Sequence, residues 1–521
     1  MIRLSDTLKG WHWTSLLGVV GAAVLISAFG ITFFPVKSDE LTVAWMAKQA
    51  AMGRVPYVDY FCFIPPLTLY GLAAFFKAFG ATLAAFRLLS VLWLLMITLL
   101  LQRLLSRGGM APSWAAGTAL LFPALFVPFW PVPSHHWFAL GVGLASMAVA
   151  DSALASCSKP LWFVSGLLAG CSGLCLQTEG ALFCLLLAGT FLLLAPRPLD
   201  WKAALWTLGG VVLPLLIFAG MLAPQGALGD ALYCLVVWPA NYYKQPGGFN
   251  DLNILSSVGS ELARRWPPSG EFNGIMGSAS FLCALLAALW APVSLALSPA
   301  WTDGGTDHKP LCRWASGLLG LLATAVVFLG GRAEWVHLTL FIPLLVVLSA
   351  REVNWNRERF RPFLFKGLLS ICLTVCAFRW MAFWAQSPPL MMDILRVDTL
   401  VRENSVPSIL ADLPRVDGQP PPVVFLPHGA DLYFYWAPIP PPLDWVEPPS
   451  FKYNAPGDYA ALAVFLMRER IPFVLVQANT EDMFLGQASP LQSVLSSAYR
   501  PVRRGRLGLL LERKPDAPAT R

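Results

Sequence analysis

Two adjacent carboxylates stand directly after the first long apolar run of the chain. Asp39 and Glu40 follow the run 14–34 by a few residues. A carboxylate at a membrane interface can meet a lipid-borne substrate on one side and water on the other, where it can take a proton as a general base. Acids in the first turn of a helix also stabilise it through the helix dipole, so a structural role explains the same pair. Either role predicts a helix over about 38–52 that ends before Gly53.

Further polar side chains stand in short segments between apolar runs. Tyrosine, histidine, amide and carboxylate groups can contact a sugar or an acceptor, while lysine, arginine and histidine can hold a phosphate. For three of these residues a structural role remains open instead of a binding role. Glu179 could cap the start of a helix, Lys244 could anchor the chain at the membrane interface, and the Arg332 side chain could snorkel from a helix end to the membrane surface. The candidates for substrate binding are Tyr57, Asp59, His135, His136, Gln177, Glu179, Lys244, Arg332 and His337.

The histidines and cysteines give little sign of a metal ion. On a helix, His135 and His136 would point about 100° apart and would rarely share one metal. Most of the 10 cysteines lie inside apolar stretches, a distribution typical of buried free thiols rather than of a zinc site or a disulfide framework. We expect no metal and no other cofactor, with a divalent cation as the minor alternative.

Composition places most of the chain in lipid. Hydrophobic residues make up 56% of the 521 residues, charged residues make up 13%, and mean hydropathy is +0.60, whereas soluble proteins are nearer half apolar and a quarter charged. A spanning helix needs roughly 20 mostly apolar residues. The sequence predicts a polytopic α-helical membrane protein with about eleven such helices, at 14–34, 84–105, 113–131, 137–156, 161–177, 180–196, 203–223, 275–297, 315–331, 338–351 and 365–386.

The run 67–81 is not among these spans. It holds only about 15 apolar residues with Lys77 inside, which suits a helix lying in the interface. With a cytoplasmic N-terminus, the basic cluster at 351–366 then lies in the cytoplasm, as the positive-inside rule requires. The long first loop 35–83 lies outside. Because Lys and Arg mark topology in this way, the net charge of +7 does not indicate a nucleic-acid partner.

The composition changes after Gln386. Three short apolar segments are typical of buried strands and a fourth segment is typical of an amphipathic helix, at 422–427, 472–477, 507–514 and 458–470 respectively. We expect a small extracytoplasmic α/β domain over 387–521, joined to a membrane domain over 1–386.

The first outer loop resembles a known family in an ordered set of motifs. The set contains Asp39-Glu40, Gly53-Arg54-Val55-Pro56-Tyr57-Val58-Asp59, Pro65-Pro66-Leu67, Phe79-Gly80 and Ala85-Phe86-Arg87-Leu88. It is similar to the polyprenyl-phosphate-sugar glycosyltransferases, which include the protein O-mannosyltransferases and the lipid A aminoarabinose transferases with the GT-C membrane fold. The resemblance is dense over 34–95 and diffuse afterwards.

The resemblance implies a GT-C-like fold and a reaction. A sugar would pass with inversion from an undecaprenyl- or dolichyl-type phosphate carrier to a lipid, glycan or protein acceptor at the outer face of a bacterial inner membrane. Asp39 matches the family's proposed base, Glu40 is its neighbour, and the C-terminal domain would be periplasmic. One departure concerns the phosphate, because the aminoarabinose transferases carry a Lys before the Pro-Pro pair where this chain has Ile64.

Two other functions remain open. A transporter or lipid flippase with an outer receptor domain would need ionisable groups in the middle of its spans or paired broken helices, and the predicted spans are nearly free of charge. A scaffold would keep the fold without the chemistry. Substitution of Asp39 with a transfer assay separates the transferase from the scaffold, and counterflow in proteoliposomes separates it from the transporter.

The positions of the loops relative to the membrane give the first testable prediction. Cysteine labelling or reporter fusions should place residues 390–521 outside and residue 356 inside, because the basic cluster at 351–366 is held in the cytoplasm. Cytoplasmic labelling of the C-terminal residues would show that the helix count and the face assigned to every candidate residue are wrong.

Overall fold

The computed structural model groups the chain into two compact units. Unit 1 combines Met1–Pro35, Arg87–Ile217 and Phe249–Met392, and unit 2 combines Val36–Phe86, Phe218–Gly248 and Asp393–Arg521. The structure describes residues 19–24, 38–107, 112–126, 134–194, 200–239, 413, 421–426, 456–477, 481–486, 488–505 and 508–516. The predicted domain boundary at 387 lies outside these residues.

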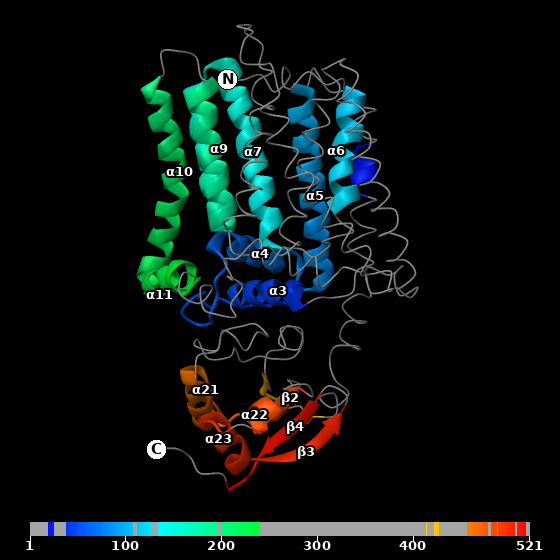
Figure 1. Ribbon diagram of the computed structural model, residues 1–521, viewed down its shortest axis with the longest axis vertical. Helices are drawn as coiled ribbons and strands as arrows, with labels where there is room; N and C mark the ends of the chain where they lie inside the picture. Colours follow the sequence, from blue (N-terminus) through cyan, green and yellow to red (C-terminus); the bar gives the residue numbers. More distant parts are fainter. Residues whose placement is uncertain are drawn as a thin grey trace, which may run out of the picture. The chain divides into compact units, whose positions relative to one another are not determined.

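Unit 1 is built from long apolar helices that lie side by side (Figure 1). The described helices of this unit include α5 (Leu83–Arg107), α6 (Pro112–Phe126), α7 (His135–Ser156), α8 (Lys159–Cys175), α9 (Gln177–Leu194) and α10 (Trp201–Leu222). Each coincides with one of the apolar runs predicted between residues 84 and 223, so the sequence pattern located these helices correctly.

Three helices within the described ranges are long and apolar enough to cross a membrane, namely Ala84–Arg107, His135–Ser156 and Trp201–Gln225. The predicted span 14–34 is described only over 19–24, which is helical. The predicted spans at 275–297, 315–331, 338–351 and 365–386 lie outside the described residues. The total of about eleven therefore stays a prediction.

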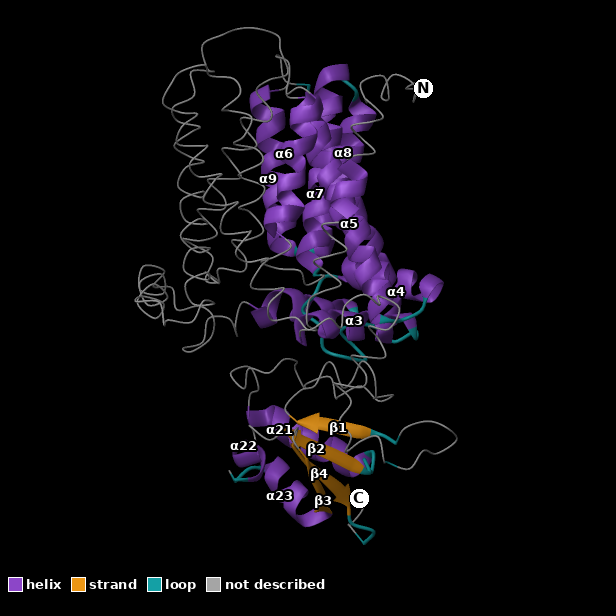
Figure 2. Ribbon diagram, turned by 90° about the vertical axis from the view of Figure 1, so that its right-hand side faces the viewer, coloured by secondary structure: helices purple, strands orange, loops and turns teal. Residues whose placement is uncertain are grey.

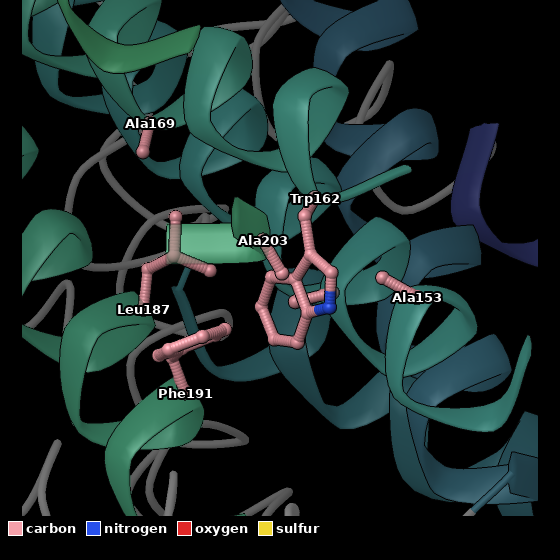
Figure 3. Packing of buried hydrophobic residues seen from close by; sticks show 7 residues of the cluster. Ala153, Trp162, Ala169, Leu187, Phe191 and Ala203 are labelled. Atoms are coloured by element: carbon pink, nitrogen blue, oxygen red, sulfur yellow. The ribbon is translucent and has the colours of Figure 1, made fainter. Parts of the chain in front are cut away.

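An aromatic pair surrounded by alanines forms part of the core of unit 1 (Figure 3). The Trp162 and Phe191 rings meet edge to face with their centroids 5.2 Å apart. Small side chains from the neighbouring helices, among them Ala153 and Ala203, pack against the Trp162 ring. Because alanine leaves room for a ring at the helix contact, α7, α8, α9 and α10 can all approach one cluster.

Two helices of unit 1 touch through their backbones. A methyl group built on Gly166 of α8 would overlap the carbonyl oxygen of Thr207 in α10, and one on Gly210 of α10 would overlap the carbonyl oxygen of Phe163 in α8. Small residues at such crossings allow the close packing that holds membrane helices together where water provides no hydrophobic drive.

Basic residues gather at one end of unit 1. Arg107 Nε lies 2.8 Å from Asp151 Oδ2, joining the end of α5 to the last turns of α7. Lys159 Nζ lies 3.1 Å from Asp200 Oδ2, which joins the starts of α8 and α10. These residues come from the loops predicted to be cytoplasmic, and the structure shows that they share one end of the helix bundle.

The segment predicted as the first outer loop supplies the first part of unit 2. Helix α3 (Ser38–Ala51) packs on α4 (Pro66–Phe79), and α4 is a short apolar helix, as predicted for 67–81. The chain returns to unit 2 after Ile217 with η1 (Ala223–Gln225), α11 (Leu228–Leu232) and the π-helical turn η2 (Tyr233–Val237). Trp238 follows this turn and packs against Phe61 and Phe63 of the first loop.

A four-stranded sheet forms the C-terminal part of the described chain (Figure 2). The strand order is β1 (Val423–Leu426), β2 (Phe473–Gln477), β4 (Gly508–Arg513) and β3 (Tyr499–Gly505). Strand β1 pairs with β2 in parallel, whereas β4 pairs antiparallel with both β2 and β3. Helices α21 (Pro456–Arg468), α22 (Glu481–Leu485) and α23 (Pro490–Ala498) lie beside the sheet.

The predicted strands and helix of this segment are confirmed, with one addition. The segments 422–427, 472–477 and 507–514 are β1, β2 and β4, and 458–470 is α21. The last predicted strand does not close the sheet, because β3 lies beyond it at the edge. Strand β3 reads YRPVRRG and exposes six of its seven residues, so it carries no apolar pattern that sequence analysis could detect.

A pair of adjacent glycines tests the contact between α8 and α10. In Gly210→Ala the new methyl group would overlap Phe163, so we expect the overpacking to cost about 1–3 kcal/mol and to lower the melting temperature of the purified full-length protein. Gly209 faces open space, and Gly209→Ala should leave the melting temperature unchanged or raise it through helix propensity. Equal effects of the two substitutions would show that this contact does not limit stability.

Candidate active site

The two adjacent acids lie in the first turn of α3. The helix begins at Ser38, carries Asp39 and Glu40 as its next residues, and ends at Ala51. The predicted helix over about 38–52 is therefore confirmed. Gly53 follows the helix with a φ of 89°, a value that favours glycine and stops the helix as expected. The side chains of Asp39 and Glu40 lie outside the described part of the structure.

The loop after α3 is held by two buried tyrosines, which we call the tyrosine clasp. Tyr57 donates from its hydroxyl to the carbonyl oxygen of Ile64 at 2.9 Å, and Tyr60 donates to the carbonyl oxygen of Met46 in α3 at 3.0 Å. Both side chains are fully buried. Burial raises the pKa of both phenols well above their usual range, so the two hydroxyls remain donors through the neutral pH range.

The clasp holds a strained backbone. Tyr57 has a φ of 75°, in the left-handed region where a bulky side chain costs roughly 1–2 kcal/mol. Its amide donates to the carbonyl oxygen of Tyr60 at 3.0 Å. Asp59 stabilises the same turn, because its Oδ2 accepts from the Val55 amide at 2.7 Å. Asp59 is exposed and Tyr57 has no exposed surface, and a substrate contact by either residue stays a prediction.

The Pro-Pro pair starts the second helix of this loop. Pro65 is the N-cap of α4 with extended backbone angles, and Pro66 is its first residue, where proline loses no helical hydrogen bond. Ile64 directly before them is buried. Its carbonyl oxygen receives the hydroxyl of Tyr57, so the segment from Tyr57 to the start of α4 is one connected structure.

Two of the predicted binding residues in unit 1 meet directly. His136 in the first turn of α7 places Nδ1 2.7 Å from Oε1 of Glu179, which lies in the first turn of α9. The His136 side chain is 19% exposed and that of Glu179 is 7% exposed. The carboxylate therefore stands behind the imidazole, an arrangement that fixes the orientation of the ring and stabilises its protonated form.

Close helix packing sets the position of Glu179. The turn between α8 and α9 consists of Leu176 alone, and a methyl group on Gly180 would overlap the backbone of Gly173 in α8. Gln177 is the first residue of α9. The hairpin is therefore so tight that Glu179, next to Gly180, is presented at the end of the bundle where α7 begins.

The start of α7 is also fixed from α5. Trp93 Nε1 donates to the carbonyl oxygen of Trp137 at 2.7 Å. His135 stacks against His136, with ring centroids 4.5 Å apart. Several polar atoms at this end are buried without a hydrogen-bond partner, and Oγ of Ser134, directly before α7, and Oε2 of Glu179 are two of them. We refer to Ser134, His136 and Glu179 as the His136 corner.

The predicted site residues do not all lie in one unit or in the described part of the chain. Lys244, Arg332 and His337 lie outside the described residues. Asp39 and Glu40 belong to unit 2, whereas the His136 corner belongs to unit 1. Among the residues that the structure describes, no group of three or more His, Cys, Asp or Glu side chains is arranged to hold a metal ion.

Sequence inspection missed several residues of these sites. Tyr60, Trp93 and Ser134 gave no recognisable motif by themselves. Phe61 and Phe63 form an aromatic pair in alternation that can be seen in the sequence, but their partner Trp238 lies far along the chain. Such contacts follow from tertiary packing, which residue spacing alone does not reveal.

Comparisons with known proteins give two similar solved structures. No protein-family model and no curated protein matches the sequence. The Archaeoglobus fulgidus oligosaccharyltransferase, solved in complex with Zn and sulfate, has a TM-score of 0.48 and 14% identity, covering 92% of this chain and 71% of its own. ArnT from Cupriavidus metallidurans, bound to undecaprenyl phosphate, has a TM-score of 0.46 and 12% identity. The match covers 98% of this chain and 100% of the ArnT chain. Both are glycosyltransferases of the GT-C fold, and at this level of similarity neither assigns a role to a residue of this chain.

The tyrosine clasp gives a prediction with a matched control. Tyr57→Phe keeps the ring but removes the hydroxyl that donates to the buried Ile64 carbonyl oxygen, which then keeps only the weak Cys62 thiol donor at 3.5 Å, so we expect a loss of about 1–3 kcal/mol in stability. Tyr70 of α4 is half-buried and stacks on Phe218, with no hydrogen bond from its hydroxyl among the described residues. Tyr70→Phe should therefore change the melting temperature little. Equal melting temperatures for the two variants would show that the clasp does not stabilise the loop.

Proposed function

We propose that this chain is a membrane glycosyltransferase that moves a sugar from a polyprenyl-phosphate carrier to an acceptor hydroxyl at the outer face of the membrane. Asp39 is the general base and Glu40 orients the acceptor or adjusts the charge of its neighbour. The acceptor is a lipid, a glycan or a protein. The observation that carries the proposal is the acid pair in the first turn of α3, directly after an apolar run and on a segment held by the tyrosine clasp.

The reaction needs one base and no acid. The Asp39 carboxylate takes the proton of the acceptor hydroxyl as the acceptor oxygen bonds to the anomeric carbon. The bond between that carbon and the phosphate oxygen breaks, and the polyprenyl phosphate leaves with the electron pair. Attack opposite the leaving group inverts the anomeric centre. The first turn of a helix favours a negatively charged side chain, which is the form that accepts a proton.

The clasp supports this assignment because a base must be held in place. Tyr60 ties the loop to the carbonyl oxygen of Met46, and the Trp45 and Tyr60 rings meet edge to face with centroids 5.7 Å apart. The helix that carries Asp39 is thus anchored to the loop through a buried network. Positioned groups contribute most to catalysis when neighbouring packing fixes them.

The leaving phosphate needs positive charge or hydrogen-bond donors. Lys244, Arg332 and His337 are the proposed groups from the sequence, and Arg332 would act on the charge that grows as the bond breaks. Tyr57, Asp59 and Gln177 are proposed contacts to sugar or acceptor, and Glu179 is proposed to support His136 on the donor side. Undecaprenyl phosphate, which the Cupriavidus metallidurans structure holds, is the carrier to use first in assays.

A transporter or flippase remains the alternative. The ionisable side chains buried in the described helices of unit 1 lie near helix ends, where Asp151 pairs with Arg107 and Glu179 pairs with His136. The buried polar residues between the ends are neutral, as in the reciprocal Ser146 and Ser165 hydrogen bonds. Ion-coupled transport uses charged groups near the middle of the membrane, so this distribution favours the transferase.

Asp39→Asn tests the proposed base. Asn is also a good helix cap, so expression and folding should be kept, while transfer to the acceptor should fall by on the order of 10²–10⁴. The assay uses envelope extracts to identify donor and acceptor by mass spectrometry, then measures transfer by purified protein. Near-normal transfer by a well-folded variant would remove the catalytic role and leave Asp39 as a helix cap.

Two companion variants separate the roles of the neighbouring groups. Glu40→Gln should lower transfer less than Asp39→Asn, because it changes an orienting group rather than the base. Arg332→Ala should lower transfer even with donor in excess if its contact strengthens in the transition state.

A further inference from the structure

The His136 corner combines features that no structural need of the helices explains. Glu179 is more than nine-tenths buried, and only one of its two carboxylate oxygens is bonded, to His136. Ser134 is 6% exposed, and its hydroxyl makes no hydrogen bond to the start of α7 although it occupies the N-cap. Among the unsatisfied buried polar atoms at this end, one belongs to the residue two positions before His136 and one to its ion-pair partner. Such groups are rare in native proteins and mark places where a further polar group binds.

The electrostatics of this corner favour an anion in front of the imidazole. Helices α7 and α9 both begin here, and the start of a helix carries partial positive charge and open amide donors. The contact of 2.7 Å lets His136 and Glu179 share a proton, and the carboxylate stabilises the imidazolium when the ring holds that proton. The His136 ring is the more exposed of the two side chains, so it is the one that can donate to an anion.

The distribution of other cations strengthens this argument. Arg103, Arg107, Lys159 and Lys202 belong to the opposite end of the described helices in unit 1, where Arg107 and Lys159 form ion pairs. Arg87, in the first turns of α5, is buried and has a partner of its own. Among the described side chains of unit 1, an anionic group of a lipid at the His136 end therefore has His136 as a partly exposed cation, beside the ring of His135.

We infer that the His136 corner binds the phosphate group of a polyprenyl-phosphate lipid, with His136 and the Ser134 hydroxyl as contacts and Glu179 as a positioning residue. This inference rests on the proposed function, which supplies a lipid phosphate as donor and as product. His136 donates to a phosphate oxygen, and Glu179 holds the ring and its charge. The Ser134 hydroxyl gains the partner that it lacks within the protein.

The chemistry of the corner argues against two other ligands. A metal ion would have His136 and Glu179 as its two ligands from the described side chains of the corner, fewer than the three or four that protein metal sites supply. A neutral sugar hydroxyl would make no use of an imidazolium charge. A phosphate uses both the charge and the donors, and charged hydrogen bonds are about twice as strong as neutral ones.

Lipid binding by the full-length protein tests the inference without a transfer assay. The protein is placed in nanodiscs of phosphatidylcholine, and dissociation constants are measured for undecaprenyl phosphate and for undecaprenol, which lacks the phosphate. The wild type should bind undecaprenyl phosphate more tightly. His136→Gln should weaken that binding roughly tenfold, the usual effect of losing a charged hydrogen bond, and should leave binding of undecaprenol unchanged.

Two further variants distinguish positioning from general damage. Glu179→Gln should weaken binding of undecaprenyl phosphate by a smaller factor, and the double variant should bind no worse than His136→Gln alone, because Glu179 acts through His136. Asp151→Asn is the matched control, since Asp151 is equally buried in an ion pair at the other end of the bundle. It should leave the binding of both lipids unchanged.

Each outcome bears on a different claim. Equal binding of undecaprenyl phosphate by wild type and His136→Gln overturns the inference and leaves the proposed function standing. Equal binding of undecaprenyl phosphate and undecaprenol by the wild type contradicts the donor class and the inference together. Displacement of the lipid by inorganic phosphate at the same concentration shows a free-phosphate site and overturns the lipid assignment. If the His136 and Glu179 variants do not fold, Ser134→Ala must weaken phosphate-dependent binding about threefold, and no effect overturns the inference.

Discussion

The contact between Gly173 and Gly180 is the constraint on which the described end of unit 1 depends. It brings the backbones of α8 and α9 together so closely that no side chain fits at Gly180. The one-residue turn at Leu176 and the packing of Phe183 against Gly143 follow from the same approach. Glu179 has no freedom to point elsewhere, since its neighbour Gly180 is fixed. A buried carboxylate in an apolar bundle is therefore held in place by packing, before any charge interaction is considered.

In the described helices of unit 1, charged side chains lie near the two ends, and the two ends differ. At one end Arg107 and Lys159 are about 40% exposed while they pair with Asp151 and Asp200, so solvent and lipid head groups share the cost of these charges. At the other end the His136 corner is nearly enclosed. An enclosed pair with an unsatisfied oxygen is costly for stability. Its presence is easier to explain by ligand binding than by folding.

The helices could be located from the sequence because lipid imposes a simple rule. A spanning segment must be apolar and long enough, so the runs between residues 84 and 223 identified α5 to α10 directly. Strands β1, β2 and β4 were found for a similar reason, since each is apolar and buried. Strand β3 was not found, because an exposed edge strand with three arginines satisfies its backbone through β4 without an apolar face.

The candidate site was less predictable, because residue type gives chemistry but not position. The sequence singled out His136 and Glu179 separately, 43 residues apart, and only the α8 to α9 hairpin brings them together. Tyr57 and Asp59 lie close together in the sequence, and both belong to one turn. They were chosen as binding residues, and the structure uses their polar groups to hold a strained turn through Ile64 and Val55. These bonds show what the polar groups of Tyr57 and Asp59 do within the loop, and their contact with a substrate stays a prediction. The acid pair of α3 precedes this turn in the sequence, and it remains the proposed place of the base.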